Sequence, residues 1–275
     1  MTAFAASTAP QSYVIRGGAA GRERLRILAR VVQPTTRALL QRGGVAAGMV
    51  CLDVGCGGGD GSVELAKLVG PSGRVVGVDL DATKIELARR EAAEQGLSQI
   101  EFHVAAADAA PGLAFDVVYA RFLLTHLADP AAVLRAMLAR LRPGGIAIVE
   151  DIDFRGHFCE PPLFAFQRYV DLYTAVAQAR GADPNIGPRL PGLLREAGAE
   201  VVGVQVVQPA GIDGDVKQIA AITMENLADA LLDSGLAAAD DIRGLTAQLV
   251  AAAADSRTLM SLPRIVQAWG RRPAA

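Results

Sequence analysis

Glycines and carboxylates gather in one short stretch of this 275-residue chain, residues 50–60, which reads VCLDVGCGGGD. An apolar run breaks into glycines here, and a helical pattern follows over residues 61–69. Glycines let a ligand approach the backbone closely, and the start of a helix presents unpaired N–H groups. The stretch therefore predicts a strand, a tight turn and a helix that together bind a ligand.

The spacing of these glycines limits which ligand the turn can bind. A dinucleotide fingerprint needs Gly-x-Gly-x-x-Gly, but the sixth position is Asp60 when counted from Gly55 and Ser62 when counted from Gly57. The chain also has no Gly-x-x-x-x-Gly-Lys motif of a phosphate-binding loop. An NAD-dependent oxidoreductase stays as an alternative that this spacing weighs against.

Two further acids follow the next strands that the pattern predicts. The apolar run over 74–79 ends in Asp79, and a carboxylate at the end of such a strand can accept both hydroxyls of a ribose. A third strand, predicted over 100–104, precedes Asp108, which is suitably placed to meet an adenine amino group. The acids therefore suit an adenosine ligand.

A fourth strand predicted over 115–121 and an LRPGG turn into a fifth strand over 141–150 extend the pattern. With the turn at 55–59, these motifs resemble those of the class I, Rossmann-like S-adenosylmethionine (SAM)-dependent methyltransferases of the small-molecule type. The resemblance is continuous over about residues 45–155. It implies a doubly wound α/β fold around a seven-stranded, mostly parallel sheet with helical lid insertions. It also implies SAM as cofactor and S-adenosylhomocysteine as product.

The resemblance assigns cofactor roles residue by residue. The methionine end of SAM would lie against the turn and the end of the fourth strand, the ribose against the acid after the second strand, and the adenine beyond it. An N-terminal aromatic would close the pocket. The residues assigned to the methionine end are Asp53, Gly55, Cys56, Gly57, Gly59, Ala120 and Arg121. The ribose is assigned to Asp79, and the adenine to Leu80, Ala107 and Asp108. The closing aromatic is Tyr13. For Asp53, a purely structural role within the turn stays open.

The acceptor side has weaker signals. His157, with a near-neutral unperturbed pKa, is the best candidate for a general base, and His126 and Asp153 are further catalytic candidates. For both histidines a role without chemistry stays open. Candidate substrate-binding residues are Arg16, Phe158, Tyr169, Tyr173, Asn185 and Met224. The two tyrosines belong to an aromatic stripe whose alternative role is core packing. We expect no metal site, because no cluster of His, Asp and Glu has ligand spacing.

The elements that must position these residues fall into two regions. Residues 1–44 form an N-terminal helical cap segment, with a helix over 19–32 and a second helix from Pro34 to Arg42. Residues 45–275 form the SAM-binding domain, whose last strand, over 264–270, would insert antiparallel between its neighbours. Lid insertions are expected at about 152–187 and 211–262, with helices over 163–179, 216–234 and 237–254.

Bulk properties exclude several classes. A net charge of −2 argues against a nucleic-acid partner. The first residues lack a signal-peptide pattern, and no apolar run is long enough to span a membrane. Three cysteines without paired or metal spacing fit a reducing, cytoplasmic setting. An Ala-rich helical lid suggests a homodimer interface.

Taken together, the sequence predicts an enzyme that transfers the methyl group of SAM to an O, N or C atom of a small, hydrophobic metabolite, as in secondary metabolism. The transfer would be an in-line displacement, which depends on positioning more than on acid–base chemistry. The alternative is a SAM-binding protein of the same fold that catalyses cyclisation, decarboxylation or hydroxylation, because the cofactor motif would be the same.

Overall fold

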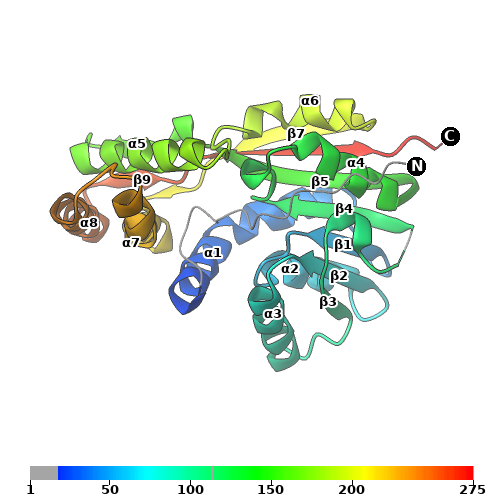
Figure 1. Ribbon diagram of the computed structural model, residues 1–275. Helices are drawn as coiled ribbons and strands as arrows, with labels where there is room; N and C mark the ends of the chain where they lie inside the picture. Colours follow the sequence, from blue (N-terminus) through cyan, green and yellow to red (C-terminus); the bar gives the residue numbers. More distant parts are fainter. Residues whose placement is uncertain (1–17, 113, 275) are drawn as a thin grey trace.

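The computed structural model describes residues 18–112 and 114–274, and its centre is a seven-stranded sheet in the order β3-β2-β1-β4-β5-β10-β7 (Figure 1). Strands β1 to β5 pair in parallel, and β10 runs antiparallel to both β5 and β7. The predicted fold class and the antiparallel insertion of the last strand are thus confirmed. The strands are β1 Val50–Val54, β2 Arg74–Asp79, β3 Ile100–Val104, β4 Phe115–Arg121, β5 Leu141–Asp153, β7 Glu200–Val207 and β10 Arg264–Arg271.

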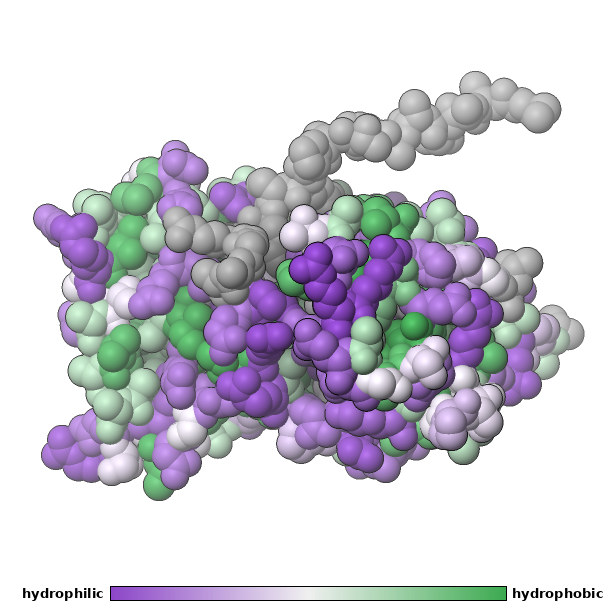
Figure 2. All heavy atoms as spheres, turned by 90° about the horizontal axis from the view of Figure 1, so that it is seen from below, coloured by the Kyte–Doolittle hydropathy of each residue, from purple (hydrophilic) through white to green (hydrophobic). Residues whose placement is uncertain are grey.

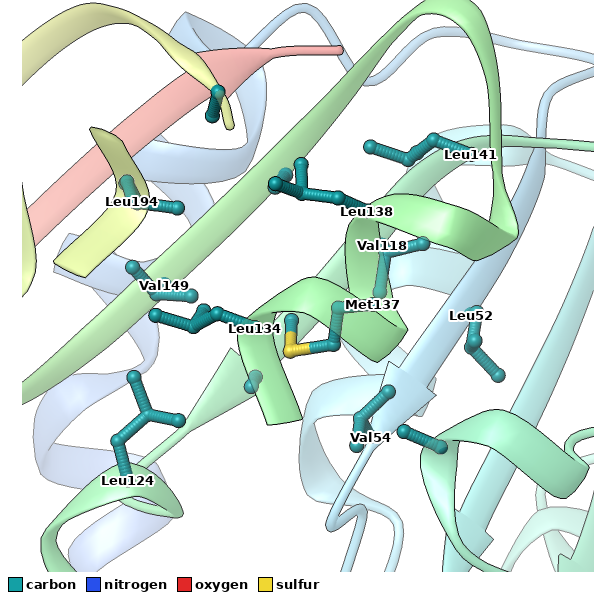
Figure 3. Close-up of a cluster of buried hydrophobic side chains, with 14 of the residues drawn as sticks. Leu52, Val54, Val118, Leu124, Leu134, Met137, Leu138, Leu141, Val149 and Leu194 are labelled. Atoms are coloured by element: carbon teal, nitrogen blue, oxygen red, sulfur yellow. The ribbon is translucent and has the colours of Figure 1, made fainter. Parts of the chain in front are cut away.

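Helices cover both faces of this sheet, as the buried strands require. On one face lie α1 (Gly18–Arg42), α2 (Asp60–Val69) and α3 (Ala82–Glu94), and on the other α4 (Pro130–Arg140) and α6 (Leu190–Glu196) (Figure 1). Alternate residues of one strand point to opposite faces: Cys51 packs with α1 and α2, whereas Leu52 packs with α4. Figure 3 shows Leu134 and Met137 of α4 directed at the core that contains Leu52.

The prediction of two N-terminal helices was wrong, because α1 continues through Pro34. Proline removes one helical hydrogen bond and disfavours the helix interior. Val32 and Thr36, on either side of it, are both fully buried, so packing holds one continuous helix in place. The Thr35 hydroxyl also donates a hydrogen bond of 2.8 Å to the carbonyl of Val32, close to Pro34.

A second layer of helices stands at the end of the sheet where β5 ends. It contains α5 (Phe164–Ala179), α7 (Asp215–Asp233) and α8 (Ala239–Ala254), which share one apolar core, and we call these three helices the helical unit. Helix α7 also packs on α1 (Figure 1). The sequence did not predict the small antiparallel sheet beside the unit, whose strands are β6 (Cys159–Glu160), β8 (Ala210–Gly211) and β9 (Leu259–Ser261). In the described part of the chain, no helix is long and apolar enough to cross a membrane.

Candidate functional site

The glycine-rich turn between β1 and α2 has the backbone geometry that its sequence indicates. Gly57 and Gly59 both have positive φ, at 55° and 87°. A Cβ at Gly59 would lie 2.9 Å from the ring of Phe102, so this glycine is required by packing. A Cβ at Gly57 would meet no atom within 4 Å, so the backbone there borders open space. Gly57 is therefore the point where a ligand can reach the main chain.

Asp79, the last residue of β2, is tied to that turn. Its Oδ2 accepts a hydrogen bond from the N–H of Gly57 over 3.0 Å, and its Oδ1 accepts one from the N–H of Asp81 over 2.9 Å. A carboxylate offers about four acceptor positions, so two or so remain for ligand hydroxyls. Leu80, the next residue, is 76% exposed and offers an apolar surface beside the carboxylate.

Asp53 lies beneath the turn and not at its open side. Its side chain is buried, and its Oδ2 accepts a hydrogen bond of 2.7 Å from the hydroxyl of Ser62 in α2. Burial raises the pKa of Asp53 to about 6, against the opposing effects of the Ser62 hydrogen bond and the charge of Arg121. The contacts favour the structural role, in which Asp53 joins the strand to the helix.

The end of β4 reaches the same place. Ala120 is buried, and the guanidinium of Arg121 lies within 3.5 Å of the Thr36 hydroxyl of α1. Phe122 follows with a φ of 53°, a region that side chains rarely adopt and that recurs at functional sites. The sequence analysis missed buried Glu150 of β5, which accepts from Thr36 over 2.6 Å beneath this strand end. Its place at the end of an apolar run gave no signal of that contact.

The remaining cofactor candidates surround these groups. Cys56 is buried, and burial raises the pKa of its thiol, so the group stays a thiol. Ala107 is buried and Asp108 exposed in the 3-10 turn η1 (Ala107–Ala109) that follows β3. Tyr13 and Arg16 lie outside the described residues. The cofactor assignments themselves stay predictions.

Arg22 of α1 is a site residue that the sequence analysis missed. Its Nη1 is 2.6 Å from a carboxylate oxygen of Asp60, its Nε donates to Glu91 of α3 over 2.9 Å, and its Nη2 donates to the carbonyl of Gly58 over 3.3 Å. These contacts hold α1 against the glycine-rich turn, beside a pocket of about 360 Å³ that Arg121 also lines. The sequence did not single out this arginine among those of residues 16–42, and only the fold selects it. In Figure 2, which shows the molecule from below the view of Figure 1, hydrophilic residues occupy the middle of the face.

His126 lies in the 3-10 turn η2 (Leu124–His126) after β4. Burial lowers its pKa to about 4, and the positive charges of Lys84 and Arg24 act in the same direction. Asp151 holds this turn, because its Oδ2 accepts from the N–H of Thr125 over 3.0 Å. The imidazole is therefore neutral at pH 7 and lies near two cations.

His157 lies in an aromatic cluster beside α5. Its Nδ1 is 3.0 Å from the carbonyl of Phe154, and its ring is 4.2 Å from that of Phe154 and 5.9 Å from that of Tyr169. Since a carbonyl only accepts, Nδ1 carries the hydrogen and Nε2 keeps a lone pair. Burial lowers the pKa of His157 to about 4, so the ring is neutral and able to accept a proton only weakly.

Asp153 is engaged by two cations. Its carboxylate is buried and pairs with Nε of Arg155 at 2.7 Å and with Nη2 of Arg264 at 2.8 Å. Each of its two carboxylate oxygens is thus held by a guanidinium. These contacts favour a role in positioning the end of β5, and the catalytic assignment stays a prediction.

The predicted substrate residues fall into two groups. Tyr169, Tyr173 and Met224 are buried in the core of the helical unit, where the ring of Tyr173 stacks on Phe154 at 3.9 Å. Much of the surface of these three side chains is thus packed in the core, which is the alternative role given above for the aromatic stripe. The other two lie nearer the outside, with Phe158 41% exposed and the Oδ1 of Asn185 accepting from the N–H of Arg155.

Arg24, on another face of α1, is a second residue that the sequence analysis missed. It is only 9% exposed, and its Nε donates to the hydroxyl of Thr223 in α7 over 2.9 Å. Tyr169 of α5 also bonds to Thr223 and feels the charge of Arg24. This contact joins the cap helix to the helical unit. Among residues 18–112 and 114–274, no three His, Cys, Asp or Glu side chains are grouped to hold a metal ion.

Comparisons with known proteins agree with this geometry. Residues 46–179 match the model of a methyltransferase domain. The ubiquinone/menaquinone biosynthesis C-methyltransferase of Hahella chejuensis is 38% identical over 116 residues, which are 41% of this chain and 47% of that protein. The chain spans about half the length of such curated relatives.

Two solved structures share the fold. A putative methyltransferase from Bacillus halodurans has a TM-score of 0.58 and 18% identity, over 86% of this chain and 98% of that one. The cyclase SpnF has a TM-score of 0.54 and 22% identity, over 88% and 82%. Residues 46–179 are thus similar to a methyltransferase domain, and the seven-stranded fold is the one that these solved structures share.

Proposed function

We propose that this chain binds SAM at the glycine-rich turn and transfers its methyl group to a small, largely hydrophobic acceptor. The observation that carries the proposal is the pairing of Gly57 with Asp79. The backbone of Gly57 borders open space, and the Asp79 carboxylate beside it retains acceptor positions for the ribose. The residues that the structure places here therefore fit the cofactor.

Bound SAM supplies a methyl group already activated by a sulfonium. The chain's own task is to hold the acceptor in line with that methyl group and to exclude water, and such positioning can contribute on the order of 7–11 kcal/mol. Arg22 keeps α1 against the turn, so the cap helix and the helical unit together suit this task. We propose that the residues 1–44 and the two insertions, 152–187 and 211–262, close the site as cap and lid.

Proton removal from the acceptor is a secondary requirement. His126 and His157 are the candidate bases, and the pKa of each is lowered to about 4 by burial. A base of that strength suits an acceptor whose proton is already acidic, because proton transfer is efficient when the two pKa values are close. The proposal therefore favours an acceptor that is anionic or nearly so at neutral pH.

A reaction without methyl transfer is the second candidate. The fold that this chain shares with a cyclase supports it, since the same cofactor site accompanies different chemistries on one fold. The secondary-metabolism setting, the cytoplasmic location, the homodimer and the lack of a nucleic-acid partner are also proposals, and they rest on composition and charge.

The test is a calorimetric titration of the whole chain with SAM, S-adenosylhomocysteine and NAD, followed by mass analysis of candidate acceptors. Binding of both sulfur ligands and a product heavier by one methylene support the proposal. Binding of both without a mass gain supports the second candidate. Binding of NAD alone would show that the turn holds a dinucleotide, and both proposals would then fail.

A further inference from the structure

Arg24 is a buried cation, and no carboxylate of residues 18–112 and 114–274 forms an ion pair with it. It is 9% exposed, and the hydroxyl of Thr223 is its acceptor at Nε. No carboxylate lies within ion-pairing distance of it among the described residues, although Arg22, two positions earlier, pairs with both Asp60 and Glu91. A guanidinium stays charged at any physiological pH, and a buried charge without a counter-charge is costly. A bound anion would remove that cost.

The surroundings of Arg24 carry the same sign. His126, in the turn η2 after β4, feels the positive charges of both Arg24 and Lys84. Tyr169 and Thr223 add neutral hydroxyl groups beside Arg24. The positive charges around Arg24 favour an anionic ligand.

Asn226 adds an independent sign of a ligand. It lies three positions after Thr223 on α7, so the two side chains share one helix face. Asn226 is 7% exposed, and its Oδ1 has no hydrogen-bond partner in the described part of the chain. Its Nδ2 donates to the carbonyl of Ile222 over 2.8 Å, which fixes which end of the amide is the oxygen. A buried acceptor without a donor is rare in native proteins.

We propose that Arg24 binds a carboxylate on the acceptor molecule and that Asn226 accepts a hydrogen bond from a hydroxyl group of the same molecule. This inference rests on the proposed function for the identity of the site, and it narrows the acceptor to a hydroxylated organic acid with an apolar body. SAM also has a carboxylate, but the geometry separates the two roles. The arginine over the turn is Arg22, which contacts Gly58, whereas Arg24 bonds to the helical unit.

The experiment compares three small aromatic probes on the whole chain, with and without S-adenosylhomocysteine. Salicylate has both groups, salicylamide lacks the charge, and benzoate lacks the hydroxyl. We expect wild type to bind salicylate roughly tenfold or more tightly than salicylamide, as charge-assisted hydrogen bonds are the strong ones. Equal binding of these two probes by wild type overturns the proposal, whatever the variants do.

Three variants assign the preference to residues. Arg24→Gln should abolish the preference for salicylate over salicylamide, and Asn226→Leu should abolish the preference for salicylate over benzoate. The control is Arg37→Gln, an exposed arginine of the same helix with the same change of charge, which should keep both preferences. If Arg24→Gln keeps the charge preference and instead weakens SAM, the guanidinium serves the cofactor and the proposal is wrong.

The outcomes separate this inference from the proposed function. SAM titration reports on the turn, and the probe series without cofactor reports on Arg24 and Asn226. A protein that prefers salicylate but does not bind SAM supports the inference and contradicts the proposed function. A protein that binds SAM but does not prefer salicylate over salicylamide supports the proposed function and contradicts the inference.

Discussion

The glycine-rich turn and the helical unit are built in different ways. The turn uses backbone atoms and the carboxylate of Asp79, which bonds to Gly57 over a short separation in sequence. The helical unit uses side chains from distant segments, and the bond between Arg24 and Thr223 joins residues 199 positions apart. Asp79 brings a carboxylate to the first region, and Arg24 brings a guanidinium to the edge of the second, where α1 meets α7. The comparison teaches that the proposed cofactor side is a local property of the sequence, whereas the proposed acceptor side depends on how segments meet.

The largest effect should come from Asp79→Ala. The variant removes the predicted ribose acceptor and also leaves the N–H of Gly57 without its partner, so we expect SAM affinity to fall by about 100-fold or more. Calorimetry measures this change. Asp81→Ala is the control, because Asp81 caps α3 and is exposed. It should cost about 1 kcal/mol of stability and leave the affinity unchanged. An Asp79 variant within threefold of wild type would show that the ribose lies elsewhere.

His157, in the aromatic cluster beside α5, should contribute to the pH dependence of stability. The pKa of His157 is about 4 in the folded state and about 6.5 in the unfolded chain, so the unfolded state binds the extra proton as pH falls through this window. His157 should therefore lower the free energy of unfolding by about 2 kcal/mol between pH 6.5 and 4.5. Buried Asp53 and Asp151, with raised pKa values of about 6 and 7, act in the opposite direction, so the variant must be compared with wild type.

Denaturant unfolding at both pH values measures that difference. His157→Gln should lose less stability than wild type on acidification, even if it is less stable at every pH. His103→Gln is the control, since the His103 side chain is 38% exposed on β3. If the variant and wild type respond equally to acid, His157 takes up its proton in the folded protein and is not part of a dry aromatic cluster.

A smaller effect separates ligand contact from backbone strain at the turn. Gly57→Ala and Gly70→Ala both place a Cβ at positive φ, 55° and 67°, where no protein atom lies within 4 Å. Each should cost about 1–2 kcal/mol of stability. Only Gly57→Ala should also weaken SAM, by roughly tenfold or more, because its methyl group enters the ligand's space. Equal SAM affinities in the two variants would mean that the cofactor does not contact Gly57.

The smallest expected effect is a gain in the stability of the unliganded protein. Asn226→Leu removes a buried oxygen that has no partner in the described part of the chain, so the unliganded protein should gain about 1 kcal/mol of stability. Thermal unfolding measures this gain. Ser234→Ala, at the end of the same helix, is the control, because the Ser234 hydroxyl bonds to the carbonyl of Ala230 and its loss should not stabilise. A clear loss of stability in Asn226→Leu would reveal a partner for that oxygen and contradict its assignment to a ligand.

The sequence was most informative where one local motif fixes one conformation. The bounds of β2, β3 and β4 agree with the predicted strands, since each is an apolar run flanked by turn residues. A local signal also fixes the start of α3, where the carboxylate of Asp81 accepts from the N–H of Thr83. The exception is Pro34, where tertiary packing outweighed a local signal that favoured a break.

The amino-acid sequence by itself determined the sheet, the turn and the acid that follows it, because glycine conformation, strand periodicity and capping act over a few residues. Only the tertiary structure decided which of the seven arginines between residues 16 and 42 matter, since Arg22 and Arg24 differ in which distant elements they meet. It also decided that Asp153 is paired with Arg155 and Arg264, whereas Arg24 has no carboxylate partner among the residues that the structure describes. Burial and partners set the chemistry of a charged side chain, and neither is a property of its neighbours in sequence.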